Sequence, residues 1–261
     1  MDWGIQNRLS RMIKPASGRI VMLAVDHGYF QGPTTGLQDL KSTLDPLLPY
    51  ADTLMITRGM LRNCVDPGVG VPIMLRVSGG NSVLSDLSNE DLTCDMEDAI
   101  RLNACGITLS IYVGAEHEHQ TLVNLGRLAD WGNKNGVPVM AVTAVGRDMA
   151  RDARYLGLAS RMAAEIGAHM VKTYYCEDFK KVTTATPVPI VIAGGKKIPE
   201  KDALQMAANA IAEGASGVDM GRNIFQAEDP VAMIQAVRSV VHENNPPDKA
   251  YQMYQDLKAK K

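Results

Sequence analysis

Short apolar runs alternate with longer amphipathic stretches along the chain. The runs are nearly continuous and rich in β-branched residues, a pattern typical of parallel strands that helices cover. Eight such runs are expected to form strands, at residues 19–25, 53–57, 72–77, 107–113, 138–143, 170–174, 188–193 and 217–220. The clearest helical patterns lie at residues 124–135, 153–166, 200–213 and 229–242.

The breaks between these elements support repeated β/α units. Helical patterns end shortly before the next strand at four glycines, as expected of glycines that terminate helices: Gly106, Gly136, Gly167 and Gly214. Residues 1–13 precede the first strand and are predicted to cap the bottom of a barrel. Residues 246–261, which open with two prolines, are predicted to form a separate tail helix.

This organisation predicts an α/β fold, a (β/α)8 TIM barrel with an N-terminal capping segment and a C-terminal helical tail. No linker divides the 261 residues, so we expect a single domain over residues 1–261. The alternative is an open, doubly wound sheet, which should carry a GxGxxG turn after its first strand. The chain has Asp26-His27-Gly28-Tyr29 at that point instead.

Composition narrows the class of protein. The formal net charge of −2 leaves no electrostatic footprint for nucleic acid. The apolar runs are shorter than the roughly 20 residues of a membrane helix, and residues 1–17 lack the apolar region of a signal peptide. We therefore expect a cytoplasmic protein that binds neither nucleic acid nor membrane. The four cysteines have no CxxC spacing and are expected to be reduced thiols.

Functional residues of a (β/α)8 barrel gather at the carboxyl ends of the strands and in the loops that follow. The polar and glycine residues at these ends are therefore the candidates: Asp26, His27, Arg58, Arg76, Ser78, Gly79, Gly80, Tyr112, Thr143, Lys172, Tyr174, Gly194, Gly195, Gly221, Arg222 and Asn223.

Lys172 is the most informative candidate. It lies inside an apolar run, and alternation sends Lys172 and Tyr174 to one face of the strand. Burial destabilises an ammonium ion, and a neutral amine is the nucleophile that Schiff-base formation with a ketone or aldehyde requires. Lys172 is therefore a candidate catalytic residue. The alternative is a buried structural ion pair, with Asp26 as a possible partner.

Two glycine-containing strand ends predict a phosphate site. Barrel phosphate sites are typically built by the loops after the seventh and eighth strands. Gly194 and Gly195 follow the seventh strand and allow backbone N–H groups to approach an anion closely. Gly221 follows the eighth strand, and Arg222 adds a charge-assisted contact. Plain turns are the alternative role of these glycines.

Asp26 and His27 follow the first strand. Asp26 is a candidate for holding the lysine's proton or orienting a substrate hydroxyl, and His27 is a candidate proton shuttle. In the alternative, Asp26 caps a turn and His27 satisfies a loop carbonyl. No metal site is expected, because the four remaining histidines are interpreted as solvated surface residues: His117, His119, His169 and His242.

Five segments together carry a family resemblance. Residues 21–28 read VMLAVDHG, 31–36 QGPTTG, 171–175 VKTYY, 189–197 PIVIAGGKK and 217–226 GVDMGRNIFQ. In this order they resemble the archaeal-type class I aldolase family, and within it most closely a coenzyme A-dependent thiolase branch. The likeness extends from about Asp2 into the C-terminal tail.

The resemblance implies an enzyme of autoinducer-2 catabolism that uses coenzyme A as co-substrate, without a permanently bound cofactor. The implied substrate is a phosphorylated hydroxy-dione, cleaved to acetyl-CoA and dihydroxyacetone phosphate. By the same likeness the essential lysine and histidine are Lys172 and His27, and the assembly is a homo-oligomer, a decamer.

The sequence departs from the sugar-phosphate aldolases of the family in two places. Those enzymes carry Lys-x-Lys on the sixth strand and use the second lysine for the Schiff base, where this chain has Tyr174. They also place a tyrosine after the fifth strand, whereas residues 142–145 here read VTAV. Both departures favour the thiolase branch. The alternatives are a Schiff-base aldolase acting on a sugar phosphate such as fructose 1,6-bisphosphate, and an isomerase or catalytically silent phosphosugar-binding barrel.

Overall fold

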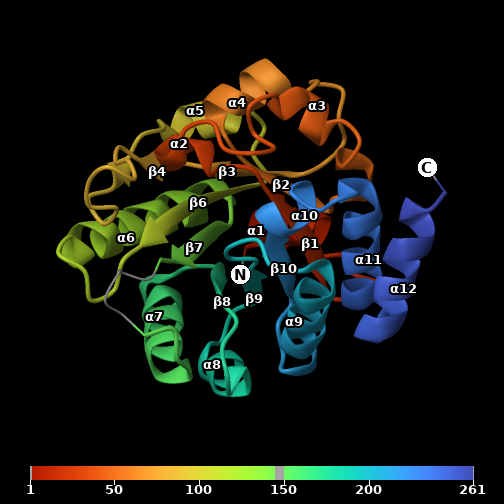
Figure 1. Ribbon diagram of the computed structural model, residues 1–261. Coiled ribbons are helices and arrows are strands. Elements are labelled where there is room, and N and C mark those ends of the chain that lie inside the picture. Colours follow the sequence, from red (N-terminus) through yellow and green to blue (C-terminus); the bar gives the residue numbers. More distant parts are fainter. Residues whose placement is uncertain (1, 145–149, 261) are drawn as a thin grey trace.

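A closed barrel of parallel strands forms the centre of the computed structural model, which describes residues 2–144 and 150–260 (Figure 1). Around the barrel the strands follow the order β1-β10-β9-β8-β7-β6-β3-β2. Their bounds are β1 Ile20–Ala24, β2 Thr53–Thr57, β3 Ile73–Arg76, β6 Gly106–Ile111, β7 Val139–Thr143, β8 Met170–Tyr174, β9 Ile190–Ala193 and β10 Gly217–Met220. All eight predicted strands are present, and the predicted (β/α)8 barrel is confirmed.

Helices surround the barrel and follow most of its strands. The longer ones are α1 Trp3–Met12, α6 Glu118–Asn135, α7 Ala153–Ile166, α9 Glu200–Ala212, α11 Pro230–Glu243 and α12 Pro247–Lys258. The shorter ones are α2 Gly28–Gln31, α3 Leu40–Leu44, η1 Leu48–Tyr50, α4 Arg58–Cys64, α5 Met96–Arg101, α8 Phe179–Ala185 and α10 Arg222–Phe225. The four helices expected from periodicity are confirmed, although α6 begins six residues earlier than expected. The short helices span too few turns for periodicity to reveal them.

The two faces of each barrel strand contribute to different parts of the core. On β1, Val21 and Leu23 pack outward under the helices, whereas Ile20, Met22 and Ala24 point into the barrel. The interior cluster also contains a methionine from each of four further strands: Met55, Met74, Met140 and Met170. Unbranched methionine side chains fill such irregular space well.

The N-terminal segment closes the bottom of the barrel, as predicted. Helix α1 begins after Asp2, whose side chain accepts a hydrogen bond of 3.0 Å from the Gly4 N–H. Its buried face carries Ile5, Leu9 and Met12, which join the interior cluster. Since this end is plugged by apolar side chains, the opposite end, at the carboxyl ends of the strands, is the open mouth.

Two features lie outside the simple β/α repeat. A small antiparallel pair, β4 Ser78–Gly79 with β5 Asp91–Leu92, follows β3 and was not predicted. The tail forms α12, drawn in blue in Figure 1, which packs against α11 and α9. Among the described helices, none is long and apolar enough to cross a membrane.

Candidate active site at the barrel mouth

A cavity of about 380 Å³ opens at the carboxyl ends of the barrel strands. All seven residues that the sequence suggested for catalysis and phosphate binding line it: Asp26, His27, Lys172, Gly194, Gly195, Gly221 and Arg222. They come from four barrel strands and the loops that follow them, so only closure of the barrel brings them together.

Lys172 lies at the cavity wall with its side chain 9% exposed, and its Nζ is 2.9 Å from Asp219 Oδ2. The register explains the pair. Lys172 is aligned with Val191 on β9, and Val191 with Gly217 on β10, so Asp219 lies two residues further along the inner face. The suggested pairing of Lys172 with Asp26 is wrong, because the Asp26 carboxylate is bound to Arg76 instead.

Asp219 is fully buried, and its Oδ1 lacks a hydrogen-bond partner among the residues that the structure describes. Burial raises the pKa of this carboxyl group, although the nearby Lys172 ammonium opposes the shift. Sequence reasoning missed Asp219. The alternation of Gly217, Val218 and Asp219 could have shown that its side chain faces the barrel interior.

Asp26 belongs to a buried charge network. Arg76 donates from Nε to Asp26 Oδ2 at 2.9 Å and from a terminal nitrogen to Ser110 Oγ at 2.9 Å. Burial raises the pKa of Asp26, but the charge and hydrogen bond of Arg76, together with the charge of Lys172, outweigh it and hold that pKa below its usual value. Asp26 therefore remains a carboxylate at neutral pH.

Glu90, which directly precedes β5, supplies a second buried carboxylate to this network. Glu90 accepts hydrogen bonds from the Tyr29 hydroxyl at 3.0 Å, from the Tyr112 hydroxyl at 3.4 Å and from Ser78. Burial raises the pKa of both tyrosines, and the charge of Glu90 adds to the shift. Both phenols consequently remain protonated and point their hydrogen toward Glu90.

His27 faces the cavity as a neutral imidazole. Burial lowers its pKa to about 4, and the positive charges of Lys172, Arg222 and Arg76 act in the same direction against the opposing charge of Asp26. Its Nδ1 is 4.0 Å from Asp26 Oδ1 and is without a hydrogen-bond partner within residues 2–144 and 150–260. The ring is therefore available to accept a proton.

The turn after β10 lies directly against this imidazole. A Cβ atom on Gly221 would meet the Ala24 carbonyl oxygen at 2.3 Å and His27 Cε1 at 2.7 Å. Only glycine allows the backbone to approach so closely.

The loop after β9 forms the other side of the cavity, and Asn223 organises it. The Asn223 side chain donates to the Gly194 carbonyl at 2.6 Å and accepts from the Ile198 N–H at 2.9 Å. Arg222 Nε is buried and unpartnered in the described part of the chain. Lys196, which sequence reasoning missed, adds a further positive charge to the lining. This side of the cavity suits an anionic group.

At the position of the aldolase lysine, Tyr174 lies under a guanidinium group. Arg151 Cζ is 3.9 Å from the centre of the Tyr174 ring. In the stretch that lacks the aldolase tyrosine, residues 142–144 line the cavity, whereas Val145 lies outside the described residues. Tyr112 and Thr143, two further candidates, also line the cavity.

Several other candidates have different surroundings. Arg58 lies outside this cavity, where it donates to Asp98 at 3.3 Å. The prediction of a solvated His169 is wrong, since this side chain is buried and accepts a hydrogen bond from the Val139 N–H. His242 is also paired, with its Nε2 at 2.7 Å from Asp52. His119 is exposed as predicted.

The surface prediction for His117 is only partly met. The side chain is half-buried, and its Nε2 is 3.8 Å from Asp86 Oδ2.

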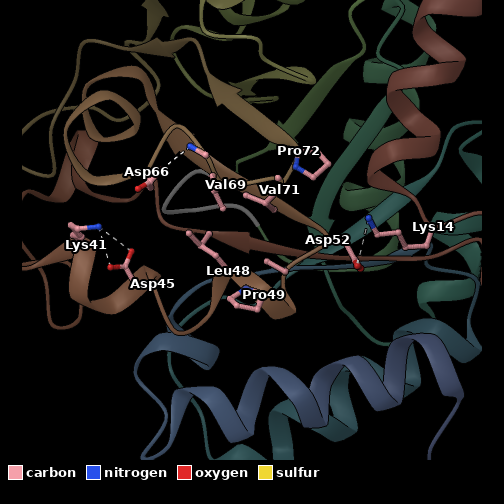
Figure 2. A pocket seen from close by; sticks show the side chains of 13 residues that line it. Lys14, Lys41, Asp45, Leu48, Pro49, Asp52, Asp66, Val69, Val71 and Pro72 are labelled. Carbon is pink, nitrogen blue, oxygen red and sulfur yellow. Dashed lines mark hydrogen bonds and ion pairs between the residues drawn. The ribbon is translucent and has the colours of Figure 1, made fainter.

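A larger hollow, of about 710 Å³, lies at the opposite end of the barrel (Figure 2). Lys14, Asp52 and Pro72, which precede β1, β2 and β3, are among the residues that line it. Figure 2 shows Asp52 paired with Lys14 at one end of this hollow. The chemically suggestive residues are nevertheless those of the smaller cavity at the mouth.

A (β/α)8 barrel whose mouth gathers a buried lysine, two aspartates, a neutral histidine and positive charge has the architecture of an enzyme. The sequence profile of the DeoC/LacD family aldolases matches residues 20–227. The chain therefore belongs to the DeoC/LacD aldolase family and is an enzyme.

Relatives and solved structures agree with this assignment. The chain is 56% identical over 255 residues to the 3-hydroxy-5-phosphonooxypentane-2,4-dione thiolase of Escherichia coli (strain K12), covering 97% of this chain and 88% of that enzyme. It is 57% identical over 259 residues to the thiolase of the same name from Enterobacter sp. (strain 638), covering 99% and 88%.

Among solved structures, an archaeal fructose 1,6-bisphosphate aldolase superposes with a TM-score of 0.81 at 26% identity, over 92% of this chain and 99% of that one. An archaeal fructose-1,6-bisphosphate aldolase with its catalytic Lys covalently bound to the carbinolamine intermediate of the substrate has a TM-score of 0.81 at 25% identity, over 91% and 99%.

Proposed function

We propose that this protein is a coenzyme A-dependent thiolase that cleaves 3-hydroxy-5-phosphonooxypentane-2,4-dione into acetyl-CoA and dihydroxyacetone phosphate. The 56% identity over 97% of the chain to thiolases of that substrate carries the proposal. Coenzyme A is a co-substrate, and the protein holds no permanent cofactor. By family resemblance the enzyme is cytoplasmic and forms a homo-oligomer, a decamer.

Lys172 engages a carbonyl of the dione. Its Nζ lies in a buried, charged part of the cavity, where a positive group stabilises developing negative charge more strongly than it would in water. It acts either as an iminium or as a cationic hydrogen-bond donor. In both forms it withdraws electrons from the carbon chain and makes the bond between C2 and C3 easier to break.

His27 handles the proton of the thiol. As a neutral imidazole with a pKa of about 4, it accepts the coenzyme A proton while the sulfur attacks the acetyl carbonyl at C2. The C2–C3 bond then breaks, and its electron pair passes to the fragment that retains the phosphate. His27 returns the proton to C3 of that fragment, which becomes dihydroxyacetone phosphate. The reaction thus needs no other proton source.

The phosphate binds at the loops after β9 and β10, at Gly194, Gly195, Gly221 and Arg222. The unpartnered Nε of Arg222 supports this role, since a buried guanidinium N–H without an acceptor is suited to an anionic ligand. Asp26 is held by Arg76 at 2.9 Å. We therefore assign it to fixing the charge around His27 and Lys172.

Aldol cleavage of fructose 1,6-bisphosphate is the second candidate, favoured by the superposition on an archaeal aldolase with a TM-score of 0.81. Tyr174 and Ala144 argue against it, because the sugar-phosphate aldolases of the family carry a lysine and a tyrosine at these places.

One assay separates the two functions. The purified protein is incubated with the dione phosphate and coenzyme A, and acetyl-CoA is measured by mass spectrometry. We expect acetyl-CoA and dihydroxyacetone phosphate in equal amounts, and neither without coenzyme A. Release of dihydroxyacetone phosphate from fructose 1,6-bisphosphate in the absence of coenzyme A would instead support the aldolase.

A further inference from the structure

Asp219 is a buried carboxylate that lines the cavity and forms an ion pair with Lys172. Its Oδ2 forms an ion pair with Lys172 Nζ at 2.9 Å, and neither Oδ1 nor Oδ2 has a partner with hydrogen-bond geometry in the described residues. The side chain is fully buried. A buried polar group with open valence is rare in folded proteins and points to a chemical role.

The two aspartates of the mouth have opposite electrostatic surroundings. Arg76 binds Asp26 directly and helps to keep its pKa low, so Asp26 is a poor proton acceptor. Asp219 faces Lys172 from β8, Asp26 from the loop after β1 and Arg76 from β3, and burial and the like charge of Asp26 raise its pKa. Carboxylates whose environments separate their pKa values take separate parts in acid–base chemistry.

We propose that Asp219 is the proton acceptor that activates Lys172 for imine formation. The inference rests on the proposed function and on the imine form of the Lys172 step. Proton transfer from the ammonium to the carboxylate replaces two buried charges with two neutral groups, which burial favours. The 2.9 Å separation is the distance over which such a transfer occurs directly.

Imine formation on Lys172 moves protons between Lys172, Asp219 and the substrate. The Lys172 ammonium gives one proton to Asp219, and the amine forms a C–N bond with the substrate carbonyl carbon while the C–O π bond breaks. A second proton passes from nitrogen to the resulting oxygen, giving a carbinolamine. Asp219 then returns its proton to that hydroxyl, the C–O bond breaks, and water leaves. The iminium on Lys172 keeps the one proton that remains.

Borohydride trapping tests this role without relying on thiolysis. The whole enzyme is mixed with dihydroxyacetone phosphate and borohydride, and the rate of mass gain on Lys172 is followed by peptide mass spectrometry. We expect Asp219→Asn to slow trapping about 100-fold, because a positioned proton acceptor accelerates a reaction by about that factor. Binding of dihydroxyacetone phosphate, measured by calorimetry, should change little. Asp98→Asn removes another buried carboxylate paired with arginines, outside the cavity, and should trap at the wild-type rate.

Two further measurements hold even if Asp219→Asn misfolds. Formate should restore trapping to Asp219→Ala, because it fits the space that the carboxylate leaves. In the wild type, the trapping rate should fall at acid pH with an apparent pKa above 3.8, the ordinary value for this group. A fall below that value would assign the role to Asp26 and overturn the proposal.

The experiments separate three outcomes: failure of the Asp219 role, failure of the imine step and failure of the thiolase function. Equal trapping rates in wild type and Asp219→Asn would make Asp219 only a counter-ion of Lys172. No adduct in the wild type would overturn the imine step and this proposal together, and the separate acetyl-CoA assay would still decide the proposed function. An adduct that depends on Asp219 in a protein without thiolase activity would leave this inference standing on a different reaction.

Discussion

Asp52 and Asp219 are both buried in the barrel, but at opposite ends. Asp52 directly precedes β2 and accepts hydrogen bonds from the Val21 N–H at 2.7 Å, from Arg238 at 2.8 Å and from His242 at 2.7 Å. Asp219, on β10 at the mouth, has the Lys172 ammonium beside one oxygen and an open Oδ1, counted over the described residues.

The difference appears in their acid–base behaviour. Burial raises the pKa of Asp52, but its hydrogen bonds with His242, Arg238 and Val21 outweigh burial and lower it. Burial dominates at Asp219 and raises its pKa. A fully satisfied carboxylate contributes to stability, whereas a partly satisfied one retains reactivity. The base of the barrel therefore holds the fold together, although its hollow is the larger one, and the mouth carries the chemistry.

The largest difference between the two ends should appear in kcat when the lysine at each end is removed in turn. Lys172→Ala is expected to lower kcat by a factor on the order of 1,000 or more, because the carbonyl loses its positive partner. Lys14→Ala removes the half-exposed lysine 3.9 Å from Asp52 and should keep wild-type kcat. Rates of acetyl-CoA formation measure both. Comparable losses in the two variants would break the distinction between the ends.

His27 should determine how the rate of thiolysis depends on pH. Its pKa is lowered to about 4, so the imidazole stays neutral and able to accept a proton until the pH falls to that value. Thiolysis should therefore persist through pH 6.5, the ordinary histidine pKa, and decline near pH 4.

His27→Asn should lower kcat at neutral pH about 1,000-fold. Part of the activity should return above about pH 8.5, where a thiol ionises unaided. A wild-type decline centred at pH 6.5 would contradict a buried, neutral His27.

A substitution at the bottom of the barrel should change the free energy of unfolding. Asp52→Asn weakens the interactions with Arg238 and His242 and is expected to lower the free energy of unfolding by about 3 kcal/mol, as measured in urea at neutral pH. The folded variant should retain wild-type KM and kcat.

The pH dependence of this loss has a definite sign. Since folding lowers the pKa of Asp52, its contribution is present above the ordinary value of 3.8 and is lost as the pH falls through the lower folded value. The difference between wild type and Asp52→Asn should therefore shrink in acid. A difference that grows in acid would show that the charge of Asp52 destabilises the fold.

The smallest effect concerns phosphate recognition. Arg222→Ala should raise KM about 10-fold with little change in kcat, because a charge-assisted hydrogen bond to a non-reacting group is lost. Arg58→Ala is the matched control, since Arg58 pairs with Asp98 outside the cavity. Inhibition by inorganic phosphate should weaken in the first variant only. An unchanged KM in Arg222→Ala would remove Arg222 from the phosphate site.

The sequence by itself determined the barrel and the strand end to which each candidate belongs. Alternation along β8 predicted that Lys172 and Tyr174 share one face of the strand, and the glycines after β9 and β10 marked two loops that line the cavity. These signals are local, because they depend on the pleat of one strand and on the conformational freedom of one residue.

Only the tertiary structure decided which groups meet. Asp219, rather than Asp26, contacts Lys172 because barrel closure and register bring the inner face of β10 level with that of β8. Arg58 and His242 likewise pair with residues far away in the sequence, Asp98 and Asp52, which lie 40 and 190 positions from them. Alternation specifies the side of a strand but neither the height of a residue in the barrel nor its neighbours across the interior. Those depend on packing summed over the whole chain.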